Sequence, residues 1–337
     1  MKILVDAFGG DNAPQEVIAG VVDAINERDG FTVVLVGKEQ EIKEQLAGYK
    51  FDQSRIEILN ADEVITCEEK PVEAIKRKPN SSICVAFKAL KEDETMSAFV
   101  SAGSTGAVLA GATLKLGRIK GVNRPALCPT MPTITGEKTV FLMDSGANAD
   151  CKPINLCQFA LMATAYAEAM GVKNPKVALL SNGTEDEKGN ALNHEVFPVL
   201  KNMKTINFAG NTEARDLITG EFDIIVADGF SGNIALKSME GALKGVLSLL
   251  KNAIYGSFAG KIGGLFLKKS LNEMKNRLDY SKYGGALFLG VHKPVIKAHG
   301  SSKRSSIKAC VFQAIQAAEN NVSEKITEKL LGEELPF

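Results

Sequence analysis

The chain has 337 residues, of which 45% are hydrophobic and 24% are charged, a composition that excludes a disordered or a fibrous protein. Its 40 basic and 40 acidic residues cancel, so no overall charge favours binding to nucleic acid. Six scattered cysteines form no CxxC pair and only three histidines accompany them, which indicates a reduced, cytosolic protein without structural zinc.

Seven apolar runs predict β-strands, and patterns typical of helices lie between them. Because the runs lack alternation, they suit strands that are buried on both faces of a parallel sheet. The first run begins at the N-terminus and predicts a strand there, not a secretory signal. A long uncharged stretch, residues 97–114, is rich in Gly, Ser and Thr, which disfavours a membrane span. The predicted strands are Lys2–Ala7, Thr32–Val36, Ile56–Leu59, Ala98–Ser101, Val140–Met143, Val177–Leu180 and Ile224–Ala227.

The repeated order of strand and helix predicts an α/β fold, a right-handed α/β/α sandwich with a mostly parallel sheet. Pro14 marks the start of the first helix. The segment Gly284–Lys297 instead predicts two short strands near a turn, so we expect a mixed sheet. No fixed-period repeat or linker divides the sequence. We therefore expect a single α/β domain over residues 1–337.

Two apolar stripes at helical spacing predict a helical hairpin over residues 239–282, with the Gly-rich segment Gly256–Gly264 separating its arms. The stretch 251–282 carries seven basic and two acidic residues, hence a net charge of 7 − 2 = +5. These residues are Lys251, Lys261, Lys268, Lys269, Lys275, Arg277 and Lys282 against Glu273 and Asp279.

Four apolar residues lie among the charges of the hairpin: Phe258, Ile262, Leu265 and Phe266. One interpretation is an intramolecular or dimer seam with a solvated face. The other is a peripheral membrane contact, in which these side chains enter the headgroup boundary and the lysines meet anionic lipid. The two interpretations are compatible, because the stripes can pair while the tip projects.

Five glycine-bearing loops follow predicted strands, and we expect them to converge on one edge of the sheet, where helix N-termini bind anions. In the first loop, Gly9 and Gly10 permit a tight turn, which a simple strand-to-helix connector also explains. A GxGxxG fingerprint is missing there, and the second strand lacks an acidic end. Both features count against a nicotinamide dehydrogenase.

The next two loops offer hydroxyls and backbone N–H groups. Ser104 and Thr105 lie in the segment SAGSTG and suit a phosphate, although helix capping alone is an alternative. Ser145 and Asn148 lie in DSGANAD, whose carboxylates offer a cation site as the alternative. No further acidic cluster supports the cation. The neighbouring Cys151 is expected to pack and not to act as a nucleophile.

The last loops add cations and an amide. Lys188, in NGTEDEKGN, is either a solvated surface charge or a phosphate clamp. Asn233 falls in the first turn of a helix, where its amide can donate to a carbonyl oxygen. His299 and Ser301, in HGSSKR, begin another helix.

Six ordered motifs, spread over nearly the whole chain, resemble those of the phosphate acyltransferases of bacterial phospholipid synthesis, which transfer an acyl group from acyl carrier protein to phosphate. They are VDAFGGDNAP, SAGSTGA, DSGAN with DCKP, NGTEDEKGN, DGFSGNIALK and HGSS. Phe8 and Asn12 depart from the family, which more often has Met and His at these positions. A catalytic histidine in the first loop is therefore not expected.

The resemblance implies a Rossmann-like α/β/α fold akin to phosphotransacetylases and isocitrate dehydrogenases, a homodimer, and peripheral association with the inner face of the cell membrane. It also implies that acyl phosphate passes to a membrane glycerol-3-phosphate acyltransferase. By the same resemblance, Lys188 stabilises the charge of phosphate and of the developing oxyanion, and Asn233 binds the thioester carbonyl. Gly9, Gly10, Ser104, Thr105, Ser145, Asn148, His299 and Ser301 are the further candidate crevice residues.

The implied reaction needs few chemical groups. Phosphate dianion is a competent nucleophile and a thiolate is a good leaving group, so we expect neither a Ser-His pair, nor a metal, nor a redox cofactor. Three alternatives stay open: a soluble phosphotransacetylase that uses acyl-CoA, a dinucleotide-dependent dehydrogenase, and a nonenzymatic membrane scaffold. The first would not need the basic hairpin, and the last would leave the five loops without a role.

Overall fold

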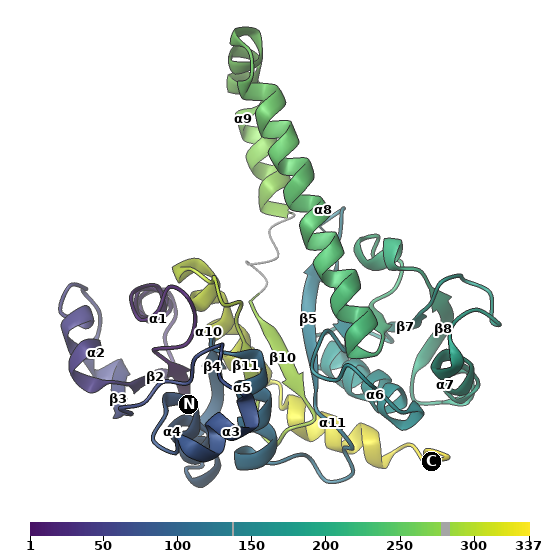
Figure 1. Ribbon diagram of the computed structural model, residues 1–337, viewed down its shortest axis with the longest axis horizontal. Coiled ribbons are helices and arrows are strands. Elements are labelled where there is room, and N and C mark those ends of the chain that lie inside the picture. Colours follow the sequence, from purple (N-terminus) through teal and green to yellow (C-terminus); the bar gives the residue numbers. More distant parts are fainter. Residues whose placement is uncertain (137, 278–283) are drawn as a thin grey trace.

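The computed structural model describes residues 1–136, 138–277 and 284–337, apart from the side chains of residues 259 and 275–277. Within these ranges the chain forms an 11-stranded sheet in the order β3-β2-β1-β4-β11-β10-β5-β6-β9-β7-β8. Helices cover both faces of this sheet, which confirms the α/β/α sandwich (Figure 1).

The strands are β1 (Lys2–Asp6), β2 (Thr32–Gly37), β3 (Ile56–Asn60), β4 (Met96–Ser101), β5 (Ala126–Pro132), β6 (Thr139–Met143), β7 (Lys176–Leu180), β8 (Asn207–Thr212), β9 (Ile224–Val226), β10 (Ala286–Leu289) and β11 (Val295–Lys297). The α-helices are α1 (Gln15–Glu27), α2 (Glu39–Leu46), α3 (Pro71–Arg77), α4 (Ser82–Glu92), α5 (Thr105–Gly111), α6 (Pro153–Ala169), α7 (Ala191–Asn202), α8 (Gly229–Tyr255), α9 (Phe258–Arg277), α10 (Arg304–Glu319) and α11 (Val322–Leu331). Short helical segments are η1 (Gln53–Arg55), η2 (Ala112–Leu116) and η3 (Ala214–Ile218).

The antiparallel pairings lie together in the middle of the sheet. β10 pairs antiparallel with β11 and with β5, and β5 pairs antiparallel with β6. The expected mixed sheet and the two strands within Gly284–Lys297 are thus confirmed. The sequence patterns missed β5 and β8, because β5 contains two prolines and β8 is a largely polar strand at the edge of the sheet.

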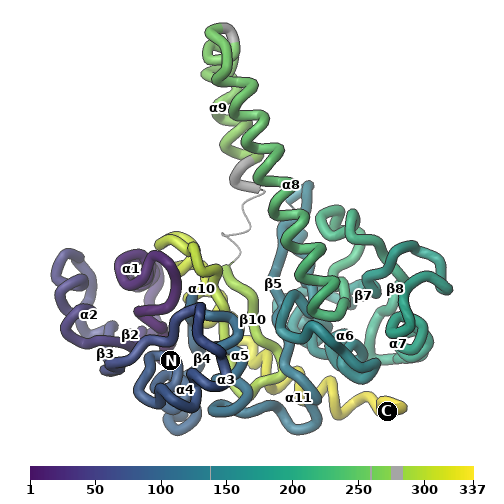
Figure 2. The backbone as a smooth tube through the Cα atoms, viewed as in Figure 1, coloured from purple at the N-terminus to yellow at the C-terminus, as the bar shows by residue number. Residues whose placement is uncertain are grey.

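The antiparallel strands reverse the sheet, so its two parallel halves run in opposite directions. The expectation that the glycine-bearing loops converge on one edge is therefore wrong. Across β11 and β10, Ser101 at the end of β4 is level with Pro129 of β5. Just after β6, Ser145 donates its backbone N–H to the carbonyl of Leu127, also in β5. Both halves thus end near the middle of β5, which lies between them in Figure 2.

Alternate strand residues pack against helices on opposite faces of the sheet. Ile3 and Val5 of β1 join the cluster built with α1, α6 and α10, whereas Leu4 joins the cluster built with α3, α4 and α5. A third cluster, around Leu142 and Ile225, lies beneath α8 and η3. Because helices bury both faces, the interiors of β1, β2, β6 and β9 are continuously apolar and show no alternation.

α8 and α9 form the expected helical hairpin, which projects from the body (Figure 1). The first arm begins at Gly229 and not at residue 239. The separator expected over Gly256–Gly264 is wrong, since only residues 256 and 257 lie between the helices. Its glycines instead let the arms approach: a Cβ added to Gly264 would stand 2.6 Å from Cγ2 of Ile254.

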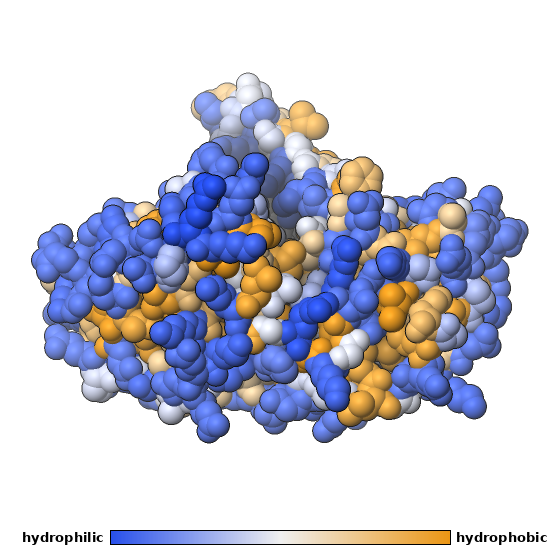
Figure 3. Space-filling model, turned by 60° about the horizontal axis from the view of Figure 1, so that its bottom comes forward, coloured by the Kyte–Doolittle hydropathy of each residue, from blue (hydrophilic) through white to orange (hydrophobic). Residues whose placement is uncertain are grey.

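The four apolar residues singled out in the hairpin are all exposed, with fractions of 81% for Phe258, 45% for Ile262, 72% for Leu265 and 86% for Phe266. In Figure 3 orange apolar groups stand among blue polar ones at the end of the projection. The side chains of Lys275 and Arg277, and all of Asp279 and Lys282, lie outside the described residues. Within the described ranges, every helix is too short or too polar to cross a bilayer.

The first turn of α8 rests on the loop that follows β6. A Cβ added to Gly232 would stand 2.0 Å from the backbone oxygen of Asp144, and one added to Gly229 would stand 2.5 Å from that of Asn148. Asp228 caps the helix by accepting the backbone N–H of Ser231 at 2.8 Å. The close approach of α8 to the loop after β6 therefore requires glycine at both Gly229 and Gly232.

Replacing Gly232 with Ala should lower the free energy of unfolding by about 1–3 kcal/mol, because the added methyl group overpacks this contact. Gly241→Ala is the matched control on the same helix, since its added Cβ has no atom within 4 Å beyond the adjacent residues and the nearby backbone of its own helix. It should be neutral or stabilising by up to about 1 kcal/mol. Denaturant unfolding measures both free energies. Equal stability of the two variants would show that α8 and the loop after β6 can move apart to accommodate the added methyl group at little cost.

Candidate active site

A pocket of about 430 Å³, here called the central pocket, lies where the two halves of the sheet meet. Residues of β5, β10, β11 and α8 line it. Four predicted site residues line it too, and each comes from a different segment: Thr105 follows β4, Ser145 follows β6, Asn233 lies in α8 and His299 follows β11. The lining also includes two lysines and one carboxylate: Lys237, Lys297 and Glu240.

A buried carboxylate holds the loop that carries Thr105. The hydroxyl of Ser101 donates to Oδ2 of Asp6 at 2.7 Å and accepts the N–H of Gly103 at 3.0 Å. Burial raises the pKa of Asp6, the largest effect on that group. Ser104 stands at the N-cap of α5 but makes no side-chain capping bond, so capping does not account for its hydroxyl.

Gly9 and Gly10 pack the first loop against its neighbours. A Cβ added to Gly9 would stand 2.5 Å from Oδ2 of Asp6 and 2.6 Å from the nitrogen of Gly103. Gly10 has a φ of +98°, and a Cβ there would stand 2.9 Å from the oxygen of Gly300. These glycines support the loops of the central pocket and do not line it.

Asp144 organises the loop after β6. Its buried carboxylate accepts the backbone N–H of Leu127 at 3.0 Å and that of Asn148 at 2.7 Å. The side-chain amide of Asn148 donates to the same carboxylate at 3.0 Å and to the carbonyl of Pro125 at 2.9 Å. Asn148 therefore positions the loop, whereas Ser145 lines the pocket while its hydroxyl donates to the carbonyl of Leu127 at 3.1 Å.

Asn233 lies at the central pocket with its side chain exposed. Gly146, whose φ is +131°, lies against it, and a Cβ there would stand 3.5 Å from Cγ of Asn233. Within the part of the chain that the structure describes, no hydrogen bond engages the Asn233 amide. Its two N–H donors are therefore available to a ligand.

His299 is held as a neutral donor. Its Nδ1 accepts the backbone N–H of Ser301 at 3.2 Å, so the proton of the neutral ring lies on Nε2. The Ser301 hydroxyl lies 2.9 Å from the same Nδ1. Burial, and then the charge of Lys237, lower the pKa of His299. Asn12 fixes this loop by donating to the carbonyls of Ser301 and Ser302, both at 3.2 Å.

Lys297 is a site residue that the sequence patterns missed. It ends β11, its side chain is buried, and it lines the central pocket. Its Nζ donates to the carbonyls of Ala102, at 3.4 Å, and of Ala298. Burial lowers the pKa of Lys297 to about 8. The signal that would have found it is a lysine inside an otherwise apolar strand, PVIKA.

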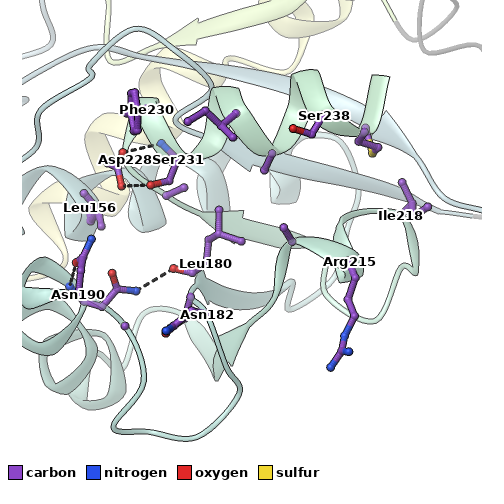
Figure 4. A pocket seen from close by; sticks show the side chains of 18 of the residues that line it. Leu156, Leu180, Asn182, Asn190, Arg215, Ile218, Asp228, Phe230, Ser231 and Ser238 are labelled. Atoms are coloured by element: carbon purple, nitrogen blue, oxygen red, sulfur yellow. Dashed lines mark hydrogen bonds between the residues drawn. The ribbon is translucent and has the colours of Figure 1, made fainter. Parts of the chain in front are cut away.

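A larger, mostly apolar pocket of about 840 Å³, here called the lateral pocket, is shown in Figure 4. Its lining places it across α8 from the central pocket. Leu180 projects toward α8 in this view, while the guanidinium of Arg215 extends away. Met239 lines both pockets, but the other α8 residues divide between two sides of the helix. Asn233, Leu236, Lys237 and Glu240 face the central pocket, and Phe230, Ser231, Ile234, Ala235, Ser238 and Ala242 face the lateral one.

Lys188 is exposed and adjoins the lateral pocket through Gly189 and Asn190. Its loop is anchored by Asn211, whose amide donates to the carbonyl of Glu185 at 2.7 Å. The structure therefore brings Thr105, Ser145, Asn233 and His299 together, and it leaves Lys188 on the other side of α8.

Two further sequence expectations concern cysteine and metal. Burial raises the pKa of the Cys151 thiol to about 11, so the thiol is protonated at neutral pH, as expected for a packing role. Across the described ranges, no group of three or more His, Cys, Asp or Glu side chains is placed to hold a metal ion.

Replacing Lys237 with Met should raise the pKa of His299, because a nearby positive charge is removed. Lys251→Met, further along α8, removes the same charge and is the control. Titration of the His299 ring by NMR measures the shift. An unchanged pKa of His299 in Lys237→Met would mean that the charge of Lys237 does not act on this ring.

The comparisons with known proteins agree with this architecture. The family model described as a fatty acid synthesis protein matches residues 1–325. The phosphate acyltransferase of Clostridium tetani is 47% identical over 98% of both chains. The phosphate acyltransferase of Bacillus cereus is 47% identical over 97% of this chain and 96% of its own.

Solved structures with the same fold are more distant in sequence. A phosphotransacetylase from Streptococcus pyogenes superposes with a TM-score of 0.63 at 18% identity, covering 95% of this chain and 94% of its own. A branched-chain phosphotransacylase from Enterococcus faecalis superposes with a TM-score of 0.55 at 14% identity, covering 94% and 99%. The fold is thus of the phosphotransacetylase type, and by its sequence the chain belongs to the phosphate acyltransferase family.

Proposed function

We propose that this enzyme transfers a long-chain fatty acyl group reversibly from acyl carrier protein to inorganic phosphate, giving acyl phosphate for phospholipid synthesis. Membership in the phosphate acyltransferase family supports phosphate and an acyl donor as the substrates. The observation that carries the proposal is the central pocket, in which Thr105, Ser145, Asn233 and His299 meet from both halves of the sheet.

The donors of the central pocket match the charge that this reaction develops. A phosphate oxygen attacks the thioester carbon, a C–O bond forms, and the carbonyl oxygen becomes an oxyanion before the C–S bond breaks and the thiolate leaves. Asn233 supplies N–H donors for that oxyanion. The neutral His299 supplies an Nε2–H donor. Such preorganised donors account for typical rate effects of roughly 100- to 1,000-fold each.

The lateral pocket supports the acyl part of the substrate. A fatty acyl chain gains about 0.8 kcal/mol for each CH₂ group that leaves water, so its donor needs an apolar surface. The lateral pocket supplies one through Leu156, Leu180 and Ile234 and shares Met239 with the central pocket. Lys188 adjoins the lateral pocket, on the other side of α8 from Asn233. We propose that its side chain reaches the phosphate or oxyanion charge when the donor is bound.

A soluble phosphotransacetylase that uses acyl-CoA is the second candidate. The phosphotransacetylase structures share the fold at 18% identity or less, which supports this alternative less strongly than the close relatives support the first. The exposed apolar hairpin also favours a lipid-linked role. The two candidates differ in the acyl donor, so a direct comparison of donors separates them.

Wild-type enzyme incubated with phosphate should form acyl phosphate and free thiol faster from long-chain acyl carrier protein than from acyl-CoA. Asn233→Ala should lower kcat by roughly 100-fold or more, because the oxyanion loses its donor. Its thermal melting should match wild type, since the amide makes no hydrogen bond in the described structure. Near-normal turnover of a folded Asn233→Ala variant would refute this assignment.

Lys188→Ala distinguishes two roles for this lysine. A loss of kcat of roughly 100-fold or more places Lys188 at the reacting atoms, as proposed. A rise in the KM for the acyl donor with kcat unchanged would restrict Lys188 to donor binding beside the lateral pocket. Repeating the assays with a chelator present tests the expectation that the reaction needs no metal.

We also propose a homodimer that associates peripherally with the inner face of the membrane and delivers acyl phosphate to a membrane glycerol-3-phosphate acyltransferase. The exposed side chains of Phe258 and Phe266 support the membrane contact, together with Lys261, Lys268 and Lys269 around them. Each such lysine near an anionic surface contributes about 1 kcal/mol.

Replacing both Phe258 and Ile262 with Asp should release the enzyme from phosphatidylglycerol vesicles, because two apolar groups become charged. The rate of acyl transfer from soluble acyl-acyl carrier protein to phosphate should stay normal. The double variant Val72→Asp and Leu331→Asp is the control, since both residues are exposed apolar positions of the body. If the tip variant still co-sediments with vesicles at physiological salt, the tip is not the anchor and a protein partner holds the enzyme there.

A further inference from the structure

Lys297 is a buried cation whose charge is only partly compensated. The residue is 8% exposed, and no carboxylate of the described residues forms an ion pair with it. Burying an ammonium group is unfavourable unless its charge and donors find partners. Two donors are engaged by the carbonyls of Ala102 and Ala298. An ammonium group has three N–H donors, so one is left for a ligand, and Lys297 lines the central pocket.

The other charges that line the central pocket neutralise each other. Lys237 and Glu240, one turn apart on α8, form an ion pair of 2.9 Å. The positive charge that remains among the described lining residues is that of Lys297. Neutral donors accompany it, namely the hydroxyl of Thr105 and the Nε2–H of His299. One cation with neighbouring neutral donors is an arrangement that suits an oxyanion ligand.

We propose that Lys297 binds the inorganic phosphate substrate, with its remaining N–H donor on a phosphate oxygen in the central pocket. This inference rests on the proposed function and names the cation that holds the nucleophile. Phosphate supplies the negatively charged partner that the buried Lys297 ammonium group lacks, so binding stabilises both groups. Lys297 thereby fixes phosphate at the ends of β4 and β11, beside the Asn233 donor.

The ionisable groups around Lys297 set its pH dependence. Asp6 on β1 and Asp11 in the following loop favour the charged form of Lys297. Cys67 and Cys310 on α10 also lie near it, but burial raises the pKa of Cys310 to about 12, so that thiol carries no charge at neutral pH. His299 lies at the end of its own strand, and the Lys237–Glu240 pair faces it from α8. Above pH 8, Lys297 loses its proton and with it the attraction for phosphate. Phosphate affinity should therefore fall by up to about tenfold between pH 7 and pH 9.

Lys293 offers a matched control on the same segment. Its Nζ also donates to two backbone carbonyls, those of Asp93 at 3.1 Å and Met96 at 2.7 Å. These carbonyls lie near the start of β4, whereas the central pocket lies near the opposite, C-terminal end of β4. Lys293→Met and Lys297→Met therefore remove the same kind of interaction, and they differ in their relation to the pocket.

Phosphate binding should be measured calorimetrically without an acyl donor, and phosphate KM and kcat in the acyl-transfer assay. Lys297→Met should raise both the phosphate Kd and the phosphate KM by roughly 10- to 100-fold, because a charged hydrogen bond is lost. The KM for the acyl donor should change little. Lys297→Arg should recover part of the affinity, and Lys293→Met should bind phosphate as wild type does.

Unchanged phosphate affinity in folded Lys297→Met would overturn the inference, and so would a loss confined to kcat. If Lys297→Met does not fold, the pH series decides: a phosphate Kd of wild type and Lys293→Met that stays constant from pH 7 to pH 9 would overturn it. Failure of the proposed function has a different signature. Wild type would then form no acyl phosphate, while its phosphate binding would still depend on Lys297.

Discussion

The site depends on the close contact between the first turn of α8 and the loop after β6. Gly232 brings the helix backbone so near to the carbonyl of Asp144 that no side chain fits between them. Asn233 is the next residue, so this contact fixes where its amide enters the central pocket. The Asp144 carboxylate in turn gathers N–H donors from Leu127 and Asn148, which ties the loop to β5. Helix, loop and central strand are thereby positioned together.

The reversed sheet explains why a single pocket can draw on so many loops. In a uniformly parallel sheet, β1, β4, β6 and β9 would end at one edge, spread over its width. Here two halves of opposite direction overlap along β5, so loops from both reach one place from opposite sides. The polar groups of the central pocket are therefore opposed to one another, which allows a nucleophile and an electrophile to be held face to face.

The glycine-bearing loops were predictable, because a loop that packs closely against neighbouring backbone requires glycine, and the glycine is visible in the sequence. Thr105, Ser145, Asn233 and His299 were found in this way, and they share one pocket. The reversal of strand direction within the sheet was not predictable, since β5 carries two prolines and lacks the sequence pattern of a strand. Lys297 was not predicted as a site residue, because its role depends on burial and on carbonyl groups distant in sequence, which a local sequence pattern does not contain. For the same reason, nothing in the sequence placed Lys188 and Asn233 on different sides of α8.

The length of α8 separates the chemistry from the hairpin tip. Its first turn carries Asn233, and its last residue, Tyr255, lies next to the turn before Phe258. At 1.5 Å per residue, 27 residues span about 40 Å, so the tip is far from the central pocket. Electrostatic effects of charges at the tip are screened over about 8–10 Å at physiological salt. Changes at the tip can therefore alter membrane attachment without altering the pocket, whereas changes at Gly232 act on every group that the helix positions.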